Sequence, residues 1–456
     1  MADVDALSQL ARKYSLQNAL EYDGEGQVKS VMGRVFGEQP ELTTQASLLG
    51  PLAAEAVAEA NSLYAEHGAE HVRQLLADEF PDALEKRVHE RREGLPELPN
   101  SEGGELVFRF APNPNGPLTL GHSRGVIINS EYSRRHSGRM VLRFDDTGIK
   151  TKPPLADAYG WIDDEFRWLT GRPPDVRLLA SERMDLYLDK ARDCLAQHIC
   201  YVCTCTADEF KVTRVAREAC PCRSRSSEQN LAEWEKMLDG TYAEGEAVVR
   251  VLTDMGERNP ALRDWPALRI QIGEHPLVGT RYRVWPLLDF QSAIDDEEQG
   301  VTHIIRGKDL MDSTRKQTQL YDKLGWTYPE TLYWGRVKVH EFGGFSTSQM
   351  RADIDAGDYS GWDDIRLPTI RALRRRGFTA ESLRLFWLEL GLTQKDISVP
   401  LATLEAHNSG LVDASTPRLS LLRDPVRLAL DVSAIEMPSE LVLPNHPTED
   451  LGVRTW

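Results

Sequence analysis

Two things are missing from this chain of 456 residues: long apolar runs and an excess of positive charge. No apolar stretch reaches the roughly 18–20 residues that a membrane-spanning helix requires. The N-terminus also lacks the charged-then-apolar layout of a signal peptide, so we expect a cytoplasmic protein with no membrane partner. The net charge of −17 argues against a general nucleic-acid coat protein, although a basic face can coexist with an acidic remainder.

Lysine is scarce as well, since it supplies only 13 of the 54 basic residues. An acidic chain whose cations are mostly arginine is compatible with a salt-adapted source or with GC-rich codon usage. The rest of the composition is ordinary for a globular protein, and the length allows two or three domains with a sizeable core.

Cysteine is rare and confined to one region, because all six cysteines lie within 29 residues. Disulfides stabilise small secreted chains, so this clustering in a long chain favours a metal site. Two C-x-C pairs separated by 14 residues suit a structural, tetrahedral zinc ion. Reduced cysteines on paired hairpins, or a vestigial site, are the alternatives. The candidate ligands are Cys203, Cys205, Cys220 and Cys222, whereas Cys194 and Cys200 are expected in the core.

Residues 1–100 are predicted to form a separate helical module. Helix formers with apolar residues at helical spacing run through LGPLAAEAVAEANSLYAEHG and AEHVRQLLADEFPDALEKRVHERREG. The stretch GLPELPNSEGGE (94–105) is rich in Pro, Gly and Ser, which predicts a linker.

From residue 105 the pattern becomes that of a parallel α/β domain, in which ligands bind at the carboxyl ends of the strands. ELVFRFAP and RMVLRFDD predict strands separated by a helix that follows Gly121. Helical patterns return at 155–169, at 182–198 and from 312. Near residue 200 the cysteine region interrupts the domain, with a strand in AEGEAVVRVLTD, and strand-like YRVWPLLDF and VTHIIRG then resume it. We therefore expect one α/β domain split by an insertion.

The segment RFAPNPNGPLTLGH (109–122) joins a predicted strand to a predicted helix. Its prolines fix the loop, and Gly116 permits a positive φ or a close approach. A helix that begins near Gly121 offers free N–H groups to phosphate, and His122 can donate a hydrogen bond to a phosphate oxygen. A Pro-rich turn with a capping histidine is the alternative, since this is neither a Walker loop nor GxGxxG.

This segment resembles the "HIGH" signature of class I aminoacyl-tRNA synthetases in its glutamyl and glutaminyl form, F-x-P-x-P-x-G-x-L-H-x-G-H. Residues 119–122, Thr-Leu-Gly-His, stand at the four signature positions. VLRFDDTG, VTHIIRGKDLMDSTRKQTQLYDKLGW and DAGDYSGWDDIRLPTIRALRRRG resemble later segments of the same group, in the same order. Over roughly 100–440 the chain resembles the archaeal-type glutamyl-tRNA synthetases, and its helical N-terminal module also fits that type.

The resemblance implies an α/β fold with a split Rossmann-like catalytic domain. Its expected parts are a helical N-terminal module (1–100), the first catalytic half (104–200), an acceptor-stem-binding insertion with a possible zinc site (201–285), the second catalytic half (286–340), a KMSKS-like loop with a helical stem-contact region (341–423), and the incomplete start of an anticodon-binding β-barrel (424–456).

The resemblance also implies a glutamate–tRNA ligase that uses ATP with Mg²⁺, L-glutamate and tRNA(Glu). Glutamate attacks the α-phosphorus of ATP, and the terminal ribose of tRNA then takes the glutamyl group. Arg109 and Arg306 are the implied carboxylate clamps, since a guanidinium suits bidentate pairing. Asp145 matches the acidic position for the substrate amino group. The implied catalytic and ATP-binding positions are Pro112, Gly116, Thr119, Gly121, His122, Ser346, Thr347 and Ser348.

Three positions depart from the family pattern. Thr119 replaces the first signature histidine, and Leu288 stands where many relatives carry a tyrosine. The segment Phe345–Gln349 matches the KMSKS loop, but Thr347 occupies its second lysine position and the loop contains no lysine. Hydroxyl and N–H groups can still bind phosphate, and Lys338 or Arg351 is expected to supply the missing charge.

A run of arginines follows this loop. Most charge runs are solvated faces, but the synthetase-like context predicts salt-sensitive contacts with tRNA phosphates. The four residues are Arg371, Arg374, Arg375 and Arg376.

The C-terminal segment 424–456 alternates like strands and corresponds to the start of the anticodon-binding barrels. A partial barrel leaves open edges, so a truncated chain or one that does not read the anticodon in the usual way is expected. Two alternatives to the ligase therefore stay open: a paralogue that passes activated glutamate to another acceptor, and a non-catalytic tRNA-binding fragment. Glutaminyl specificity is disfavoured by the arginine in HIIRGKD. The sequence carries no indication of oligomeric state.

Overall fold

The computed structural model describes residues 4–39, 42, 45–83, 94–342, 346–421, 423–427, 429, 431, 433 and 439–455. The chain divides into two compact units, Met1–Arg91 and Arg92–Trp456. Among the described residues, no helix is both long and apolar enough to cross a membrane.

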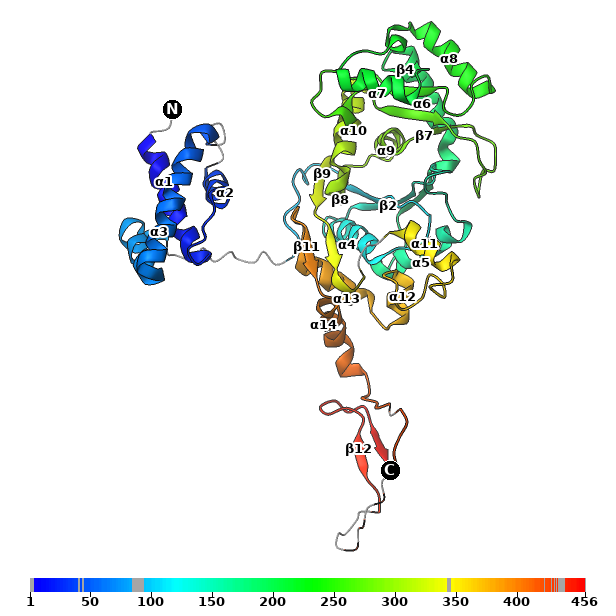
Figure 1. Cartoon of the computed structure of the whole chain (residues 1–456). Helices are drawn as coiled ribbons and strands as arrows, with labels where there is room; N and C mark the ends of the chain where they lie inside the picture. The colour runs from blue at the N-terminus through cyan, green and yellow to red at the C-terminus, as the bar shows by residue number, and fades with distance from the viewer. Residues whose placement is uncertain are drawn as a thin grey trace. The chain divides into compact units, whose positions relative to one another are not determined.

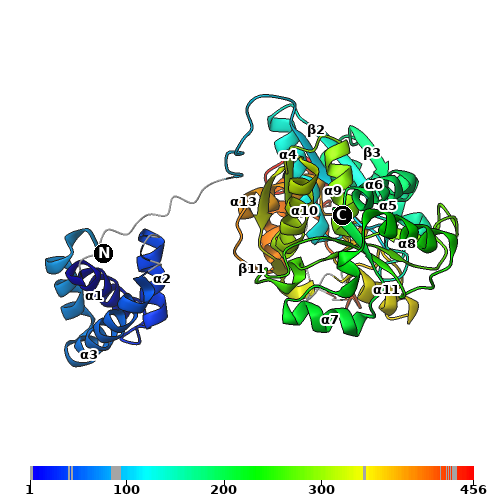
Figure 2. The ribbon, with the colours of Figure 1, turned by 90° about the horizontal axis from the view of Figure 1, so that it is seen from above.

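Unit 1 consists of the helices α1 (Val4–Glu21), α2 (Val28–Glu38) and α3 (Ala46–Glu79), with α1 packed against α3 (Figure 2). Leu7, Val31 and Leu49 are buried in their common core. The two helical segments predicted from the sequence belong to α3, which is interrupted at Gly68, where φ is 78°. The end of the second segment, 84–93, lies outside the described residues.

A five-stranded parallel sheet forms the centre of unit 2, in the order β3-β2-β1-β8-β9 (Figure 1). The predicted parallel α/β core is therefore confirmed. Successive strands run outward from β1 on one side, and the chain returns to the other side of β1 with β8. Ligands of such sheets bind at this switch point, beyond the carboxyl ends of the strands. The strands are β1 (Val107–Phe110), β2 (Arg139–Phe144), β3 (Val176–Leu179), β8 (His303–Gly307) and β9 (Glu330–Trp334).

Helices follow these strands, and the first two of them bury their apolar faces in the core beside the sheet. Phe108 of β1 and Leu142 of β2 are fully buried, and Val126 packs against them from α4. The helices are α4 (Leu120–Arg135), α5 (Ala156–Thr170), α6 (Met184–Ala196), α9 (Leu288–Glu298) and α10 (Met311–Leu324).

The insertion has its own antiparallel sheet, β4-β5-β6-β7 (green in Figure 1), and shares a core with α6, α9 and α10. Its elements are β4 (Cys200–Cys203), α7 (Ala207–Ala216), α8 (Ser227–Asp239), β5 (Val248–Val251), β6 (Pro266–Ile270) and β7 (Val284–Pro286). The prediction of one strand through YRVWPLLDF is wrong in part. Only β7 is a strand, which pairs with β6, and α9 begins at Leu288. The prediction failed here because a short apolar run fits a strand or a buried helix equally well.

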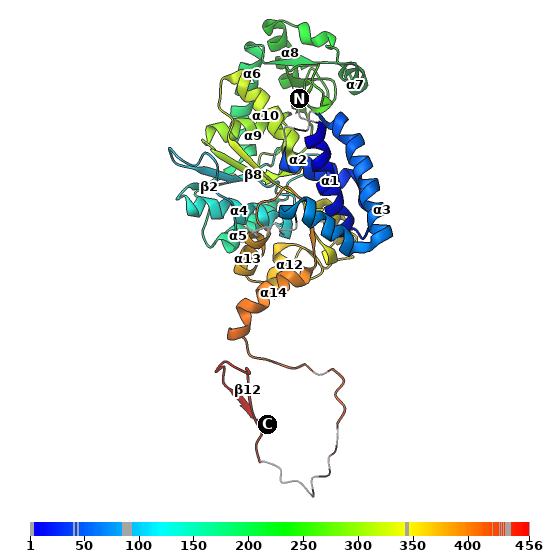
Figure 3. The ribbon, with the colours of Figure 1, turned by 90° about the vertical axis from the view of Figure 1, so that its left-hand side faces the viewer.

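The remaining elements follow β9. They are β10 (Val337–Val339), α11 (Thr347–Asp355), α12 (Ile370–Arg375), α13 (Ala380–Leu390), β11 (Ile397–Val399), α14 (Leu401–Val412), β12 (Val442–Pro444) and β13 (Val453–Thr455). Figure 3 shows the C-terminal segment that carries β12 after α14. The antiparallel pair β12–β13 contains the strands that the structure describes within 424–455.

Candidate active site

The signature segment ends in a capped helix. Thr119 is the N-cap of α4: its Oγ1 accepts a hydrogen bond from the His122 N–H (3.4 Å), and its own N–H donates to His122 Nδ1 (3.2 Å). Because Nδ1 accepts, the proton of a neutral imidazole sits on Nε2. Burial, with a smaller effect from Lys152, lowers the pKa of His122 to about 4. At neutral pH His122 is therefore an uncharged hydrogen-bond donor.

Gly116 brings this segment against the matching part of the KMSKS loop. A Cβ at Gly116 would lie 2.6 Å from Thr347 Cγ2 and 3.0 Å from the Trp362 ring. The predicted close approach is confirmed, and a side chain at this position would push the two segments apart.

Two neighbouring cavities lie at the carboxyl ends of β1, β2 and β8. One, of about 700 Å³, is lined by Pro112, Gly121, His122, Asp145, Leu288 and Ser346–Ser348, together with the cations Lys152 and Arg269. The other, of about 770 Å³, shares Gly121 and His122 and adds Thr119, Arg124 and Lys338. The fold thus gathers most of the predicted nucleotide-binding positions around adjoining spaces.

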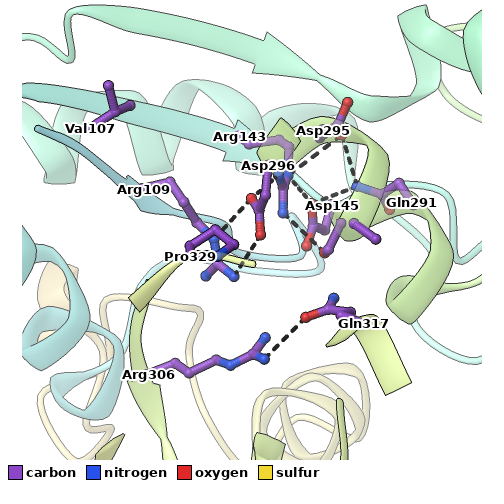
Figure 4. Close-up of polar contacts among 12 residues, drawn as sticks. Val107, Arg109, Arg143, Asp145, Gln291, Asp295, Asp296, Arg306, Gln317 and Pro329 are labelled. Carbon is purple, nitrogen blue, oxygen red and sulfur yellow. Dashed lines mark hydrogen bonds and ion pairs between the residues drawn. The ribbon is translucent and has the colours of Figure 1, made fainter. Parts of the chain in front are cut away.

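Arg143, at the end of β2, is a fully buried cation held by aspartates (Figure 4). Its Nε donates to Asp145 Oδ1 (2.8 Å) and its Nη1 to Asp296 Oδ1 (2.7 Å), with Asp295 3.6 Å away. Burial alone would lower the pKa of Arg143, but the three carboxylates outweigh it and hold the pKa well above the ordinary value.

Arg109 of β1 shares one of these aspartates. Its Nε and Nη2 donate to the two oxygens of Asp296 at 3.2 and 3.3 Å. Burial alone would raise the pKa of Asp296, but Arg109 and Arg143 reverse the shift and lower it. Asp145 also accepts from Gln291 Nε2 (2.7 Å), so the predicted ammonium-binding carboxylate is fixed from two sides.

Arg306 of β8 is buried without any carboxylate partner. Only 6% of it is exposed, and its Nη2 donates to Thr314 Oγ1 (2.7 Å), Gln317 Oε1 (3.1 Å) and the Tyr328 hydroxyl (3.1 Å). Its Nε has no partner, and no Asp or Glu among the described residues forms an ion pair with it. Burial, with a smaller effect from Arg109, lowers its pKa, whereas Asp296 and two neighbouring tyrosines act in the opposite direction. A buried guanidinium that has no ion-pair partner of its own can bind an anion from outside the chain.

The described part of the KMSKS-like loop forms a helix start. Ser346 is the N-cap of α11, and its Oγ accepts from the Gln349 N–H (3.3 Å). Phe345, the first residue of the matched segment, lies outside the described residues. Of the two cations expected to replace the loop lysine, Lys338 lines the neighbouring cavity, and Arg351 faces Asp355 at 3.9 Å.

Comparisons with known proteins agree with this geometry. A family model described as the catalytic domain of class I (E and Q) tRNA synthetases matches residues 105–413. The chain belongs to this synthetase family.

Similar proteins include several archaeal glutamate–tRNA ligases. That of Methanothrix thermoacetophila is 45% identical over 450 residues, covering 99% of this chain and 78% of the relative. That of Methanosarcina acetivorans is 46% identical, covering 97% and 77%, and that of Archaeoglobus fulgidus is 45% identical, covering 97% and 78%. Among solved structures, a glutamate tRNA ligase from Elizabethkingia meningosepticum in complex with its amino acid has 18% identity and a TM-score of 0.48, covering 68% of this chain and 70% of that one.

The arginine run of this synthetase is engaged within the chain. Arg371 stacks over Trp161, and Arg374 stacks over Trp168 and pairs with Asp164. The other two, Arg375 and Arg376, pair with Asp363 (3.4 Å) and Glu405 (3.1 Å). Arg374 and Arg375 are exposed, and the tRNA contact stays a prediction.

The four candidate zinc ligands converge in the insertion, with their sulfurs within 4.8 Å of one another. The Cys203 and Cys220 sulfurs are 3.9 Å apart, and those of Cys205 and Cys222 are 3.7 Å apart. Sulfurs around a tetrahedral zinc with Zn–S bonds near 2.3 Å lie about 3.8 Å apart. The Thr204 N–H donates to the Cys222 sulfur (3.4 Å), a hydrogen bond that would orient a metal-binding thiolate. The donor set fits a structural metal, whereas Cys194 and Cys200 are buried in the core as expected.

Several residues of the site had no signal in the sequence. Arg124, two positions after His122, is buried between Trp334 and Trp387, and its Nη atoms donate to the carbonyls of Gly335 and Gly391. Two partners of Arg143, Asp295 and Asp296, lie about 150 positions away, and Lys152 belongs to no motif. The FDD sequence after β2 could have marked the acidic side of the network, but not which cations it pairs with.

Proposed function

We propose that this chain is a glutamate–tRNA ligase, which activates L-glutamate with ATP and Mg²⁺ and transfers it to the 3′ end of tRNA(Glu). The observation that carries the proposal is Arg306, which is buried and forms no ion pair within the part of the chain that the structure describes. A buried cation beside the switch point suits the side-chain carboxylate of glutamate, whereas the neutral amide of glutamine would leave its charge unpaired. The names of the archaeal relatives support the same substrate.

Glutamate recognition is divided among three strand ends. Arg306 pairs with one substrate carboxylate, and Arg109, placed by Asp296, adds positive potential on the opposite side. Asp145, fixed by Arg143 and Gln291, accepts from the substrate ammonium group. Leu288, which lines the cavity and is 44% exposed, offers an apolar wall where a tyrosine was expected.

Activation is a displacement at phosphorus. An oxygen of the glutamate α-carboxylate forms a bond to the α-phosphorus of ATP, the bond from that phosphorus to the bridging oxygen breaks, and pyrophosphate leaves with the electron pair. The protein's part is to position the reactants and stabilise charge. His122 donates through Nε2 to a phosphate oxygen, and the first N–H groups of α4 and α11, with the hydroxyls of Ser346–Ser348, supply further donors.

Transfer follows when the terminal ribose hydroxyl of tRNA attacks the glutamyl carbonyl and AMP leaves. The insertion would hold the acceptor stem, and the exposed Arg374 and Arg375 would exchange their acidic partners for phosphates. Phosphate contacts of this kind position the tRNA and weaken with salt.

The cysteine cluster would hold a structural zinc ion. Cys203, Cys205, Cys220 and Cys222 would complete its coordination, and the bound ion would fix the turn after β4 against the segment before α8. Four thiolates leave no open position, so the ion takes no part in the chemistry.

Transfer of labelled glutamate to total tRNA, with ATP and Mg²⁺ present, tests the proposal. His122→Ala is the control, since this variant loses the phosphate donor. Charging by the wild type that is lost in the variant supports the ligase. If charging is absent but tRNA-dependent pyrophosphate exchange survives, the glutamyl group has another acceptor. If neither reaction occurs, the chain is a binding protein.

A further inference from the structure

The KMSKS-like loop of this chain brings no positive charge to the phosphates. Residues 343–349 read Gly-Gly-Phe-Ser-Thr-Ser-Gln, and the described part, Ser346–Gln349, offers only hydroxyl, amide and N–H donors. Pyrophosphate takes up negative charge as it leaves, and cations are the usual means of stabilising that charge in phosphoryl and nucleotidyl transfer. A cation from another part of the chain would act on this charge together with Mg²⁺.

Two cations line the cavity that contains Ser346–Ser348 and His122: Lys152, from the loop after β2, and Arg269, from β6. Neither Lys338 nor Arg351 is among the lining residues of this cavity. Lys338 lines its neighbour, and Arg351 points along α11 to Asp355. The choice is therefore between Lys152 and Arg269.

Lys152 is the less compensated of the two. Arg269 acts electrostatically on the Glu244 carboxylate, so part of its charge is already offset. No Asp or Glu within the described residues is ion-paired with Lys152. Its charge also acts on His122, which sets the ammonium close to the imidazole that faces the phosphates. The contrast with Lys150 is direct, because Lys150, two positions earlier in the same loop, is paired with Glu244.

We propose that Lys152 is a catalytic residue of the activation step, whose ammonium contacts the β- and γ-phosphates of ATP and neutralises the leaving pyrophosphate. The proposal rests on the proposed function for the identity of the attacking carboxylate, but not for the nucleotide. The bond to the α-phosphorus forms and breaks as described above. Lys152 stays protonated throughout, gives up no proton and makes no covalent bond.

The long, exposed stem of Lys152 suits this task. An ammonium on a flexible, exposed four-carbon stem can follow the phosphates as they separate from the nucleoside more freely than a half-buried arginine on a strand can. Lys152 thus does from the loop after β2 what the family's loop lysine does from the KMSKS segment.

The test uses the full chain with three substitutions. Lys152→Met keeps the stem and removes the charge, Lys152→Arg restores a cation, and Lys150→Met is the matched control outside the cavity. Two quantities are measured for each: the rate of tRNA-dependent ATP–pyrophosphate exchange with glutamate, and the affinity for Mg²⁺–pyrophosphate by calorimetry. Thermal melts monitor folding, which an exposed lysine should not affect.

Lys152→Met is expected to lower kcat for exchange about 10- to 100-fold, the range for losing one charged contact with phosphate. It should weaken pyrophosphate binding, with KM for glutamate within about twofold of the wild type, because the contact forms at the leaving group. Lys152→Arg should recover most of the loss, and Lys150→Met should behave as the wild type.

Equal exchange rates and pyrophosphate affinities for Lys152→Met and Lys150→Met would overturn the inference. Failure of the proposed function looks different: the wild type would not exchange with glutamate, yet its pyrophosphate binding would still depend on Lys152. A wild type that binds no pyrophosphate would overturn both.

Discussion

Two buried arginines, in the strands on either side of β1, differ in how their charge is balanced. Arg143, at the end of β2, is surrounded by three aspartates, and Arg306, in β8, has only neutral hydrogen-bond acceptors. The first arrangement is complete within the chain. The second is incomplete, because burying a charge without a counter-charge costs several kcal/mol in order-of-magnitude terms. We therefore expect Arg143 to stabilise the fold and Arg306 to bind the substrate.

The same distinction applies elsewhere in the molecule. Asp145 and Asp296 are satisfied by cations of the chain, whereas the sulfurs of the four insertion cysteines converge to within 4.8 Å of one another, which fits a set of metal ligands. Changes to groups that are complete should affect stability directly, whereas changes to groups that are incomplete should affect binding and act on stability only through what is bound.

The largest effect is expected at Arg143. Arg143→Met leaves Asp145, Asp295 and Asp296 buried with too little positive charge, so the free energy of unfolding should fall by about 3–5 kcal/mol. Urea unfolding measures it. A loss below 1 kcal/mol would mean that the aspartates do not depend on Arg143.

The cysteine cluster comes next. Cys203→Ser should reduce bound zinc from one equivalent per chain to well below one and lower the unfolding free energy by about 1–3 kcal/mol. Metal analysis and thermal melts check this, with Cys194→Ser as the control outside the cluster. Equal zinc content in both variants would exclude Cys203 as a ligand.

Arg306→Met is the counterpart of Arg143→Met, because both variants replace a buried arginine by methionine. The variant removes an uncompensated charge, so its unfolding free energy should stay within about 1 kcal/mol of the wild type or exceed it. Urea unfolding of the two methionine variants side by side gives the contrast. Equal destabilisation by both variants would contradict the expected difference between the two arginines.

The smallest effect concerns the pH dependence of His122. Its pKa of about 4 lies below the ordinary value of 6.5, so the imidazole is already neutral at pH 6 and stays neutral as pH rises. The ratio of exchange rates for the wild type and His122→Asn should therefore change by less than about twofold between pH 6 and 8. A ratio that falls as pH drops through 6.5 would mean that His122 titrates normally.

The sequence predicted the parts of this site that have local signatures. Short apolar runs bounded by Pro or Gly located β1 and β8, and the class I signature placed the loop and the start of α4. Spacing alone grouped the four cysteines. These features lie within a few positions of one another, which is the range over which sequence patterns act.

What the sequence could not supply are the long-range pairings. Asp296 reaches Arg109 and Arg143 across the sheet, and Trp161 meets Arg371 from α5. No periodicity encodes such contacts. The prediction of a strand at the start of α9 is wrong for a related reason. A short apolar run does not indicate whether it forms a strand or a buried helix. Lys152 is a candidate only because the structure shows that it lines the same cavity as Ser346–Ser348.

The most direct test of the central claim measures substrate preference in exchange. Rates of tRNA-dependent ATP–pyrophosphate exchange are determined for wild type and Arg306→Met with glutamate and with glutamine. If Arg306 meets the substrate carboxylate, the ratio of kcat/KM for glutamate to that for glutamine should fall by about 100-fold or more in the variant. An unchanged ratio would contradict the claim, because the buried charge would then have no part in recognising glutamate.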